Sequence, residues 1–307
     1  MKKSIKTRIY NAQCIGNVEP IEYMIPYPSM RSLIEGQTIK FSNEILMEKL
    51  KITNHDFYSY VQQTSNWLDD LGIKPKSRLV LPQLKYPQTE ILIYGIWNLG
   101  ASAVLPSNLS INQIKDKSDS QKLIPSNTDL FSKIKEYKSE YEPKYKPLLN
   151  DEAVLSFEKE AGVRLSHYNL LVNASGIQKA LNLKSRTRIY CDIKELSTSW
   201  IVFQVILPIY SGCIYDNLKP EVSIGKSGHD YILRNDLQNL KTFSKNDISI
   251  SIENTAALSL GSKPIHLSSY DIYKNKIIIR GHSVMMGYIN NQTNEESFKD
   301  SGLTLSF

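Results

Sequence analysis

The segment Val154–Leu171 (VLSFEKEAGVRLSHYNLL) is where the sequence comes closest to phosphate chemistry. From Gly162 onwards it reads as a tight strand-to-helix connection, with Ser166 as the N-cap of the helix and His167 after it. A loop that binds phosphate before such a helix needs glycines and small hydroxyl residues, because backbone N–H groups must close around the anion. The residues at that place are Phe157-Glu158-Lys159-Glu160-Ala161. Two glutamates and a phenylalanine do not suit phosphate, so the segment predicts a helix without a phosphate loop.

Other residues that could take part in catalysis or binding do not form a recognisable site. Gly225-Lys226-Ser227 ends like a phosphate loop, but Pro220 stands where the first glycine is needed and no strand is predicted before it. The five histidines show no metal-ligand spacing, and His167 is interpreted as a first-turn helix residue rather than a ligand. We therefore predict no metal site and assign no catalytic residue.

Composition and charge narrow the class of protein. The 307 residues are 41% hydrophobic and 22% charged, with a net charge of +6, which is typical of a globular protein. Lys133–Lys146 alternates basic and acidic residues, which favours a solvated linker over a nucleic-acid surface. The apolar runs are too short to span a membrane. The odd number of cysteines, with Cys191 and Cys213 in apolar runs, indicates a reducing compartment, so we expect a cytoplasmic protein. From the interspersed charges we expect no binding of nucleic acid.

The order of periodic and polar stretches predicts five regions. Residues 1–20 are expected to be an extended arm, and residues 21–110 a first α/β subdomain. Residues 111–150 are expected to be a linker, and residues 151–220 a second α/β subdomain. The region 221–307 is expected to be a shortened remnant that contains one more clear strand near its end.

The two predicted subdomains share a spacing. Arg78 and Arg188 each follow a leucine by seven residues, and each opens a predicted strand. Gly100 and Gly212 each end the helix that follows and lead into another short strand. This pattern indicates two related βαβ units with parallel strands. The alternative is that any two such units share turn chemistry by necessity.

Three segments resemble the adenylate-forming acyl- and aryl-CoA ligases, and together they cover a little over a third of the chain. They are Leu71–Pro106, Gly162–Gly212 and Ile277–Phe298. The third is the most specific, because IIIRGHSVMMGYINNQTNEESF is similar to the late RG-x-x-VM-x-GY motif of that family. The resemblance implies the α/β fold of the family's N-terminal domain, with two related subdomains and mainly parallel sheets. The resembling segments all belong to that N-terminal domain, and we expect the family's C-terminal lid to be missing.

Departures from the family pattern bear on function. The family's phosphate loop would lie between Phe157 and Gly162, where it is shortened, and Glu160 and Ala161 replace its proline and lysine. Glu253 could match the magnesium-binding glutamate of the family, although the residues before it do not match; a surface acid at the end of a strand is the simpler interpretation. Gly162, Ser166 and His167 would be remnants of the loop-to-helix connection.

Further expected losses concern the rest of the nucleotide site. No histidine lies between positions 168 and 228, where the family carries one. The span between Gly212 and Ile277 is shorter than in the family. The sequence ends before the aspartate that holds the ribose, and it contains no lid with a catalytic lysine.

These observations favour a degenerate ligase-like protein without adenylation activity, acting as a scaffold, acyl-binding or partner subunit with no cofactor of its own. Its partner would be an intact ligase, a lid subunit or an acyl carrier. The alternative is a working acyl- or aryl-CoA ligase that uses ATP, Mg²⁺ and CoA and takes its lid from another chain. A third possibility is a regulatory or complex-forming protein.

Overall fold

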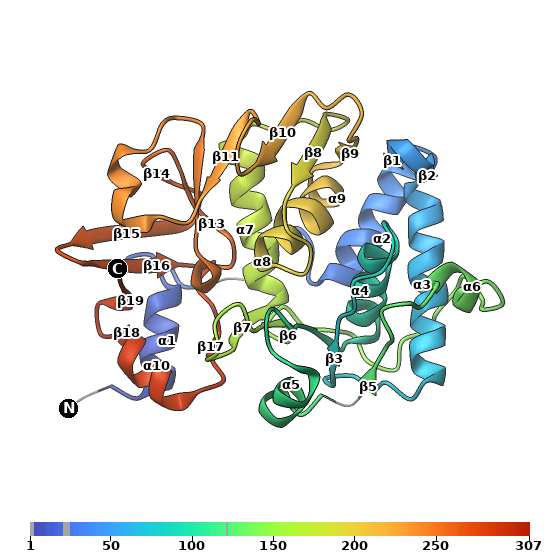
Figure 1. Cartoon of the computed structure of the whole chain (residues 1–307), viewed down its shortest axis with the longest axis horizontal. Helices are drawn as coiled ribbons and strands as arrows, with labels where there is room; N and C mark the ends of the chain where they lie inside the picture. Colours follow the sequence, from blue (N-terminus) through green and yellow to red (C-terminus); the bar gives the residue numbers. More distant parts are fainter. Residues whose placement is uncertain (1–2, 21–24, 121) are drawn as a thin grey trace.

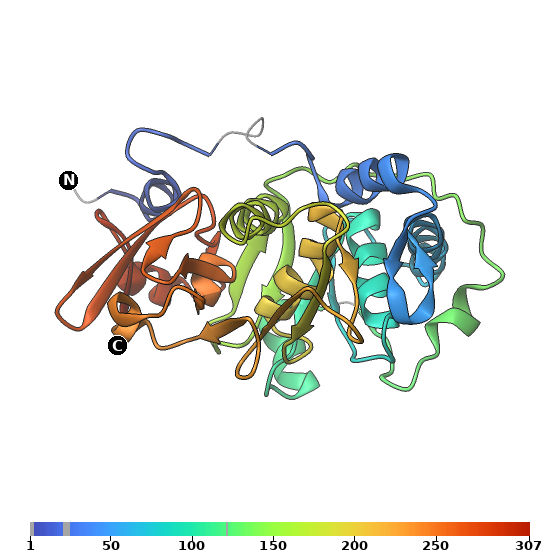
Figure 2. The ribbon, with the colours of Figure 1, turned by 90° about the horizontal axis from the view of Figure 1, so that it is seen from above.

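The computed structural model describes residues 3–20, 25–120 and 122–307, which form three β-sheets with helices between and around them (Figures 1 and 2). One sheet has six strands, the second nine and the third four. The four-stranded sheet lies at one end of the molecule with α1 (Ile5–Gln13) and α10 (Asn291–Ser297), and α3 (Asn54–Asp70) lies towards the other end. The predicted α/β class with mainly parallel sheets is confirmed for the first two sheets.

The six-stranded sheet is built around the first predicted βαβ unit. In spatial order its strands are β17 (Gly287–Tyr288), β7 (Val163–Ser166), β6 (Glu152–Ser156), β4 (Ser102–Leu105), β3 (Arg78–Val80) and β5 (Lys122–Leu123). β6, β4, β3 and β5 run parallel, and α4 (Gln88–Leu99) connects β3 to β4. β6 and β7 were expected in the second subdomain, but they pair with the first sheet.

The nine-stranded sheet collects strands from distant parts of the chain. Its spatial order is β14 (Lys263–Pro264), β13 (Ala257–Leu260), β12 (Asp247–Ile250), β11 (Tyr231–Arg234), β10 (Val222–Gly225), β8 (Arg188–Asp192), β9 (Ile214–Tyr215), β1 (Ile45–Met47) and β2 (Ile52–Thr53). The strands from β12 to β1 are parallel. A 3-10 turn, η2 (Glu48–Leu50), separates β1 from β2.

The sheets therefore do not follow the predicted regions. The region 21–110 contributes β1 and β2 to the nine-stranded sheet, and the region 221–307 contributes five strands to it. The region 221–307 therefore does not form a unit apart from the predicted subdomains. Edge strands pair wherever a free row of N–H and C=O groups is offered, so partners far apart in sequence are chosen by the tertiary fold.

The third sheet and α1 correct the expectation of an extended arm over residues 1–20. The sheet is antiparallel, with the order β15 (Ser268–Tyr273), β16 (Lys276–Gly281), β19 (Gly302–Ser306) and β18 (Phe298–Lys299). Ser4 caps α1, which packs on β16, β18 and β19. Arg8 is 2% exposed, donates to the Phe298 carbonyl oxygen and pairs with Glu295. The helix has no clear apolar stripe, because an arginine occupies a buried position.

The region 111–150 is also more structured than a linker. It contains α5 (Ile111–Ser118) and α6 (Leu130–Ile134) in addition to β5. After α6 the backbone runs along α3, where Gln63 Nε2 donates to the Tyr137 carbonyl oxygen at 3.0 Å. Gln62 Oε1 accepts from the Tyr141 N–H at 3.1 Å. Polar side chains of a helix thus hold a segment whose own sequence has no periodic pattern.

The repeat predicted from Arg78 and Arg188 is present in the backbone. The Lys76 N–H donates to the Gly100 carbonyl oxygen at 2.7 Å, and the Arg186 N–H donates to the Gly212 carbonyl oxygen at 2.7 Å. Both glycines are left-handed helix C-caps, with φ of +84° and +64°. Glycine adopts this conformation without a Cβ penalty, which explains why it ends both helices.

The helices of the two repeats differ in length. α4 has 12 residues. Its counterpart runs from Thr198 to Ser211 through α8 (Thr198–Trp200, 3 residues), the π-helical segment η3 (Ile201–Ile206, 6 residues) and α9 (Leu207–Ser211, 5 residues). A π-helical segment accommodates extra residues within a helix. The two residues by which the second repeat is longer lie in this helix.

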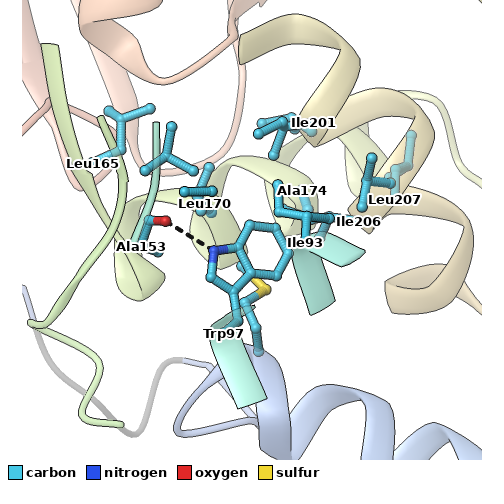
Figure 3. Packing of buried hydrophobic residues seen from close by; sticks show 14 of the residues in the cluster. Ile93, Trp97, Ala153, Leu165, Leu170, Ala174, Ile201, Ile206 and Leu207 are labelled. Atoms are coloured by element: carbon cyan, nitrogen blue, oxygen red, sulfur yellow. Dashed lines mark hydrogen bonds between the residues drawn. The ribbon is translucent and has the colours of Figure 1, made fainter. Parts of the chain in front are cut away.

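The hydrophobic core lies between α4, α7 (His167–Ala180) and the helix Thr198–Ser211, and α2 (Met30–Phe41) packs on α3, α4 and α9. Figure 3 shows Trp97 of α4 donating from Nε1 to the Ala153 carbonyl oxygen of β6 at 2.9 Å. Leu165, Leu170 and Ile201 surround this contact. The indole thus joins helix and sheet while burying a large apolar surface. Within the described ranges no helix has the length and apolarity to cross a bilayer.

Candidate functional site

The residues Phe157–Gly162, where a phosphate loop was ruled out, form a short turn between β6 and β7. The Gly162 N–H donates to the Lys159 carbonyl oxygen at 2.9 Å, and Gly162 has φ of +67°. A Cβ at Gly162 would lie 3.1 Å from both Ile289 Cδ1 and Phe157 Cε1. The glycine is therefore needed for the turn itself, and its N–H group is already used.

Glu158 of this turn caps the helix Thr198–Ser211. Its Oε1 accepts from the Thr198 N–H at 2.6 Å and from Thr198 Oγ1 at 2.7 Å, while Ser197 Oγ accepts from the Trp200 N–H. A helix N-terminus attracts anions because its first N–H groups are free and its dipole is positive there. Here a carboxylate of the protein fills that position.

Glu253 lies on the 3-10 turn η5 (Ile252–Asn254) and is 2% exposed, so the interpretation of it as a surface acid is wrong. Ser251 Oγ donates to its Oε2 at 2.9 Å, and the Tyr288 hydroxyl donates to its Oε1 at 3.1 Å. Lys159, whose side chain is half exposed, forms an ion pair with Oε1. A buried carboxylate is tolerated when it is paired and hydrogen-bonded in this way.

The loop around Glu253 is held from several directions. Its carbonyl oxygen accepts from the Met285 N–H at 2.9 Å, in the segment of the late sequence motif. Burial, followed by the negative charge of Glu253, raises the pKa of Tyr288. That hydroxyl therefore stays protonated at neutral pH and remains a donor to the carboxylate.

The turn and Glu253 border a cleft lined by both polar and apolar residues. A cavity of about 550 Å³ is lined by Glu158, Lys159, Ser251 and Glu253, among others. A second cavity, of about 670 Å³, shares Glu158, Ser199, Asn235, Asp236 and Ile250 with the first. Both lie beyond the carboxyl ends of the parallel strands β11 and β12 and border η4 (Leu237–Thr242), and the second also reaches the end of β8. Ligands of open α/β sheets bind at this edge.

The sequence-predicted remnants are not brought together. Glu253 lines the cleft, whereas Gly162, Ser166 and His167 do not. Ser166 is confirmed as the N-cap of α7, since its Oγ accepts from the Asn169 N–H at 3.1 Å. His167 is buried beside Trp97, and its Nδ1 accepts from the Met30 N–H at 3.5 Å. Burial lowers the pKa of His167 to about 4, so it is a neutral core residue.

The other candidate motifs behave largely as expected. β10 ends at Gly225, the first residue of Gly225-Lys226-Ser227, contrary to the prediction of no strand there, but β11 follows instead of a helix. No strand–loop–helix phosphate site is therefore formed. Cys191 and Cys213 are buried and unpaired. Across the described residues, no three His, Cys, Asp or Glu side chains converge as metal ligands would.

Sequence reasoning missed the roles of Glu158, Lys159 and Tyr288. Glu158 and Lys159 were considered only as residues that disfavour phosphate, although each makes a specific contact. Tyr288 lies in the Gly-Tyr step of the late motif, which was the available signal for it. Pairing a residue of the turn with one almost a hundred positions away could not be predicted without the fold.

No protein-family model and no curated protein matches the sequence. Solved structures do match. The anthranilate CoA ligase AuaEII in complex with anthranoyl-AMP aligns with a TM-score of 0.76 at 14% identity, over 94% of this chain and 76% of that chain. McyG A-PCP complexed with phenylalanyl-adenylate gives 0.72 at 14% identity, over 96% and 74%. The N-terminal domain of FACL13 from Mycobacterium tuberculosis gives 0.69 at 14% identity, over 89% and 94%. The chain has the fold of the N-terminal domain of adenylate-forming ligases.

Proposed function

We propose that this chain is a ligase-like protein that forms no adenylate itself and serves as a scaffold, an acyl-binding subunit or a partner subunit. One observation carries the proposal: the two ionic side chains of the turn that line the cleft, Glu158 and Lys159, already bind other groups of the protein. Glu158 holds the N-terminus of the helix Thr198–Ser211, and Lys159 pairs with Glu253.

The electrostatics of the cleft support this proposal. Adenylation brings a carboxylate against a triphosphate, and catalysis requires N–H donors and cations where the negative charge gathers. In this cleft the Thr198 N–H faces a carboxylate, and the only cation of the turn neutralises another. The loss of one such donor costs about 3–4 kcal/mol in activation free energy. The charged groups of the turn itself do not fit a triphosphate; the other cations of the cleft, Lys194, Lys226 and Arg234, line its second cavity.

The test is ATP–pyrophosphate exchange by the purified protein with a panel of aliphatic and aromatic carboxylic acids. We expect no exchange above the background of a heat-inactivated sample. Exchange that depends on one acid and saturates with it would overturn the proposal. Nucleotide binding is measured in parallel as a shift of the unfolding temperature with ATP and Mg²⁺, and we expect no shift.

A second function, an acyl- or aryl-CoA ligase using ATP, Mg²⁺ and CoA, is favoured by one feature. The Glu253 carboxylate is buried yet borders the cleft, and Ser251 and Tyr288 fix its orientation. Under this hypothesis a lid from another chain completes the site. It predicts ATP binding that is lost in Glu253→Gln and kept in Glu160→Gln, because Glu160 lies on the same turn and is exposed. Equal nucleotide responses in both variants would remove this alternative.

The proposed partner is an intact ligase, a lid subunit or an acyl carrier. The fold match to a structure that contains an A-PCP unit makes a carrier a reasonable first candidate. The experiment is co-purification from native extract, followed by reconstitution with the isolated partner. Partner binding that is kept in Glu253→Gln but lost when an exposed residue at the rim of the cleft is changed would show that the partner binds the rim. It would also show that the partner does not need the buried carboxylate of Glu253.

A further inference from the structure

A buried carboxylate lies at the contact between the two repeats, away from the Glu253 cleft. Glu90, in the first turn of α4, is 2% exposed. Its Oε1 accepts a hydrogen bond from Gln204 Nε2 at 2.8 Å, and Gln204 belongs to the π-helical segment η3 of the other repeat. Its Oε2 is buried without a hydrogen-bond partner. Glu90 therefore has one neutral partner and no cation to neutralise it in that contact.

The surroundings of Glu90 disfavour its charge. Burial raises the pKa of Glu90 to about 7, and the nearby carboxyl of Glu195 acts in the same direction. The hydrogen bond from Gln204 and the backbone N–H of Glu90 itself oppose the shift. Among the described residues, the other ionisable groups that interact with Glu90 are the hydroxyls of Tyr86 and Tyr215, which remain neutral. A charged Glu90 thus meets one acid and two neutral phenols.

The helix that carries Gln204 also forms a wall of the cleft. Thr198 and Ser199 at its N-terminus line the cavity of about 550 Å³, and Glu158 caps it there. Six residues further on, Gln204 contacts Glu90, and the next residue accepts a hydrogen bond at its carbonyl from the Tyr94 hydroxyl at 3.3 Å. The same helix therefore touches the cleft at one end and α4 of the first repeat in its middle.

We infer that the Glu90–Gln204 contact is a proton-controlled joint, in which loss of the Glu90 proton loosens the helix Thr198–Ser211 from α4 and so changes the cleft wall. The inference concerns the contact between the repeats, and it holds whether the chain is an enzyme or a binding subunit. A protonated carboxyl is a neutral group that the core tolerates, whereas an ionised one without a cation is costly to bury.

The direction of the pH effect follows from linkage. The folded-state pKa of Glu90, about 7, is above that of an exposed glutamate, so the folded state holds a proton that the unfolded state has lost. The stability contributed by this group is full below about pH 4.3, is lost as pH rises towards 7, and is absent above that. The joint is therefore tight on the acidic side and loose above neutrality.

The test compares wild type with Glu90→Gln, which keeps the shape and removes the charge. Hydrogen exchange is followed across Thr198–Ser211 at pH 5 and pH 8, each variant against wild type at the same pH so that intrinsic exchange rates cancel. At pH 5 we expect a difference of less than about tenfold, because only part of the proton-linked stability is lost between about pH 4.3 and pH 5. At pH 8 we expect faster exchange in wild type, by up to on the order of 100-fold where opening exposes Glu90.

A second variant tests the contact from the side of Gln204, and a third serves as a control. Gln204→Met removes the donor that stabilises the charged form of Glu90. The charged carboxylate is then costlier to bury, so the loss of protection at pH 8 should be larger than in wild type. Glu160→Gln, an exposed acid of the β6–β7 turn, should behave like wild type at both pH values. Equal protection of wild type and Glu90→Gln at pH 8, or the same difference at both pH values, would overturn the inference.

Discussion

In the first repeat, α4 follows β3 as a regular helix of 12 residues, whereas in the second the helix after β8 contains a π-helical segment and carries Thr198 at the cleft. The turns before the two strands are nevertheless matched hydrogen bond for hydrogen bond, as the Lys76–Gly100 and Arg186–Gly212 contacts show. The turns set where each strand begins, and the helix decides what is presented at the sheet edge. The part of the repeat that diverges is thus the part that borders the candidate site.

The first prediction concerns the ion pairs that open β3 and β8. Glu152 binds Arg78 through both oxygens, at 2.7 and 2.8 Å, and also Arg164, whereas in the second repeat Arg188 pairs with Asp216. Glu152→Ala leaves two guanidinium groups without their partner and should cost about 3–5 kcal/mol of unfolding free energy. Urea unfolding at pH 7 measures it.

Asp216→Ala is the matched change in the second repeat. Arg188 is more exposed than Arg78, with 37% of its side chain accessible against 24%, so water replaces the lost partner more easily. We expect a smaller cost in unfolding free energy, about 1–2 kcal/mol. This cost includes the loss of the hydrogen bond that the Leu218 N–H donates to Asp216. Equal costs in the two repeats would show that the ion pairs are as equivalent as the turns.

The second prediction uses the first residues of α3 and α7, which share a capping box but differ in chemistry. His167 is buried and neutral with a pKa of about 4, while Asn54 cannot titrate. The unfolded state takes up the proton first, so stability is full above about pH 6.5 and is lost as pH falls towards 4. The loss is about 3 kcal/mol.

The measurement is urea unfolding of wild type and His167→Gln between pH 4 and 8, both in the Glu90→Gln background, because Glu90 has the opposite pH slope over an overlapping range. The stability difference between the two proteins should change with pH only below about 6.5. A difference that is constant across the range would contradict the buried neutral state of the imidazole.

The third prediction compares the two tryptophans that lie on the paired helices. Trp97 donates its indole N–H to the Ala153 carbonyl oxygen, whereas the Nε1 of Trp200 is buried without a partner. Trp97→Phe removes a hydrogen bond, leaves the carbonyl unpaired and reduces volume, at a cost of about 2 kcal/mol. Trp200→Phe removes an unpaired donor, which offsets the lost volume. Thermal unfolding should therefore rank Trp97→Phe well below Trp200→Phe, and the reverse order would contradict the assigned indole contacts.

The fourth prediction tests whether the two turns are energetically equal. Gly100→Ala and Gly212→Ala each place a Cβ on a left-handed residue, within 2.7 Å of Tyr145 Cδ1 and of Phe41 Cε2 respectively. Each should cost more than about 1 kcal/mol, and the double variant should show the sum, because the sites share no partner. Gly72→Ala, which has positive φ but no atom within 4 Å, separates the backbone term from the contact.

How much the sequence could predict depended on how local each feature is. The repeat and the helix at Ser166 were predictable because turns and caps are decided by residues a few positions apart. The ligase-like fold was implied by the resemblance of three segments to a known family, and the late motif was the most specific of them. The exchange of strands between sheets was not predictable, because β1 and β6 are equally good strands for either sheet, and long-range pairing selects between them.

The candidate site shows the same limit. The sequence correctly showed that Glu158 and Lys159 do not make a phosphate loop, but not that they would bind Thr198 and Glu253. Glu253 looked like a surface acid because its burial depends on Lys159 and Tyr288, which are distant in sequence. α1 was missed because Arg8 finds its partners only at Phe298 and Glu295.

The docking of α1 on β16, β18 and β19 has a consequence for synthesis of the chain. Its contacts join residues up to 290 positions apart, as in the bond from Arg8 to the Phe298 carbonyl oxygen. Synthesis proceeds from the N-terminus, so α1 is made well before the strands on which it docks and cannot dock until they are made. An isolated helix of 9 residues is marginal in water. α1 therefore cannot complete its packing before β16, β18 and β19 are made, whereas the two repeats are made before those strands.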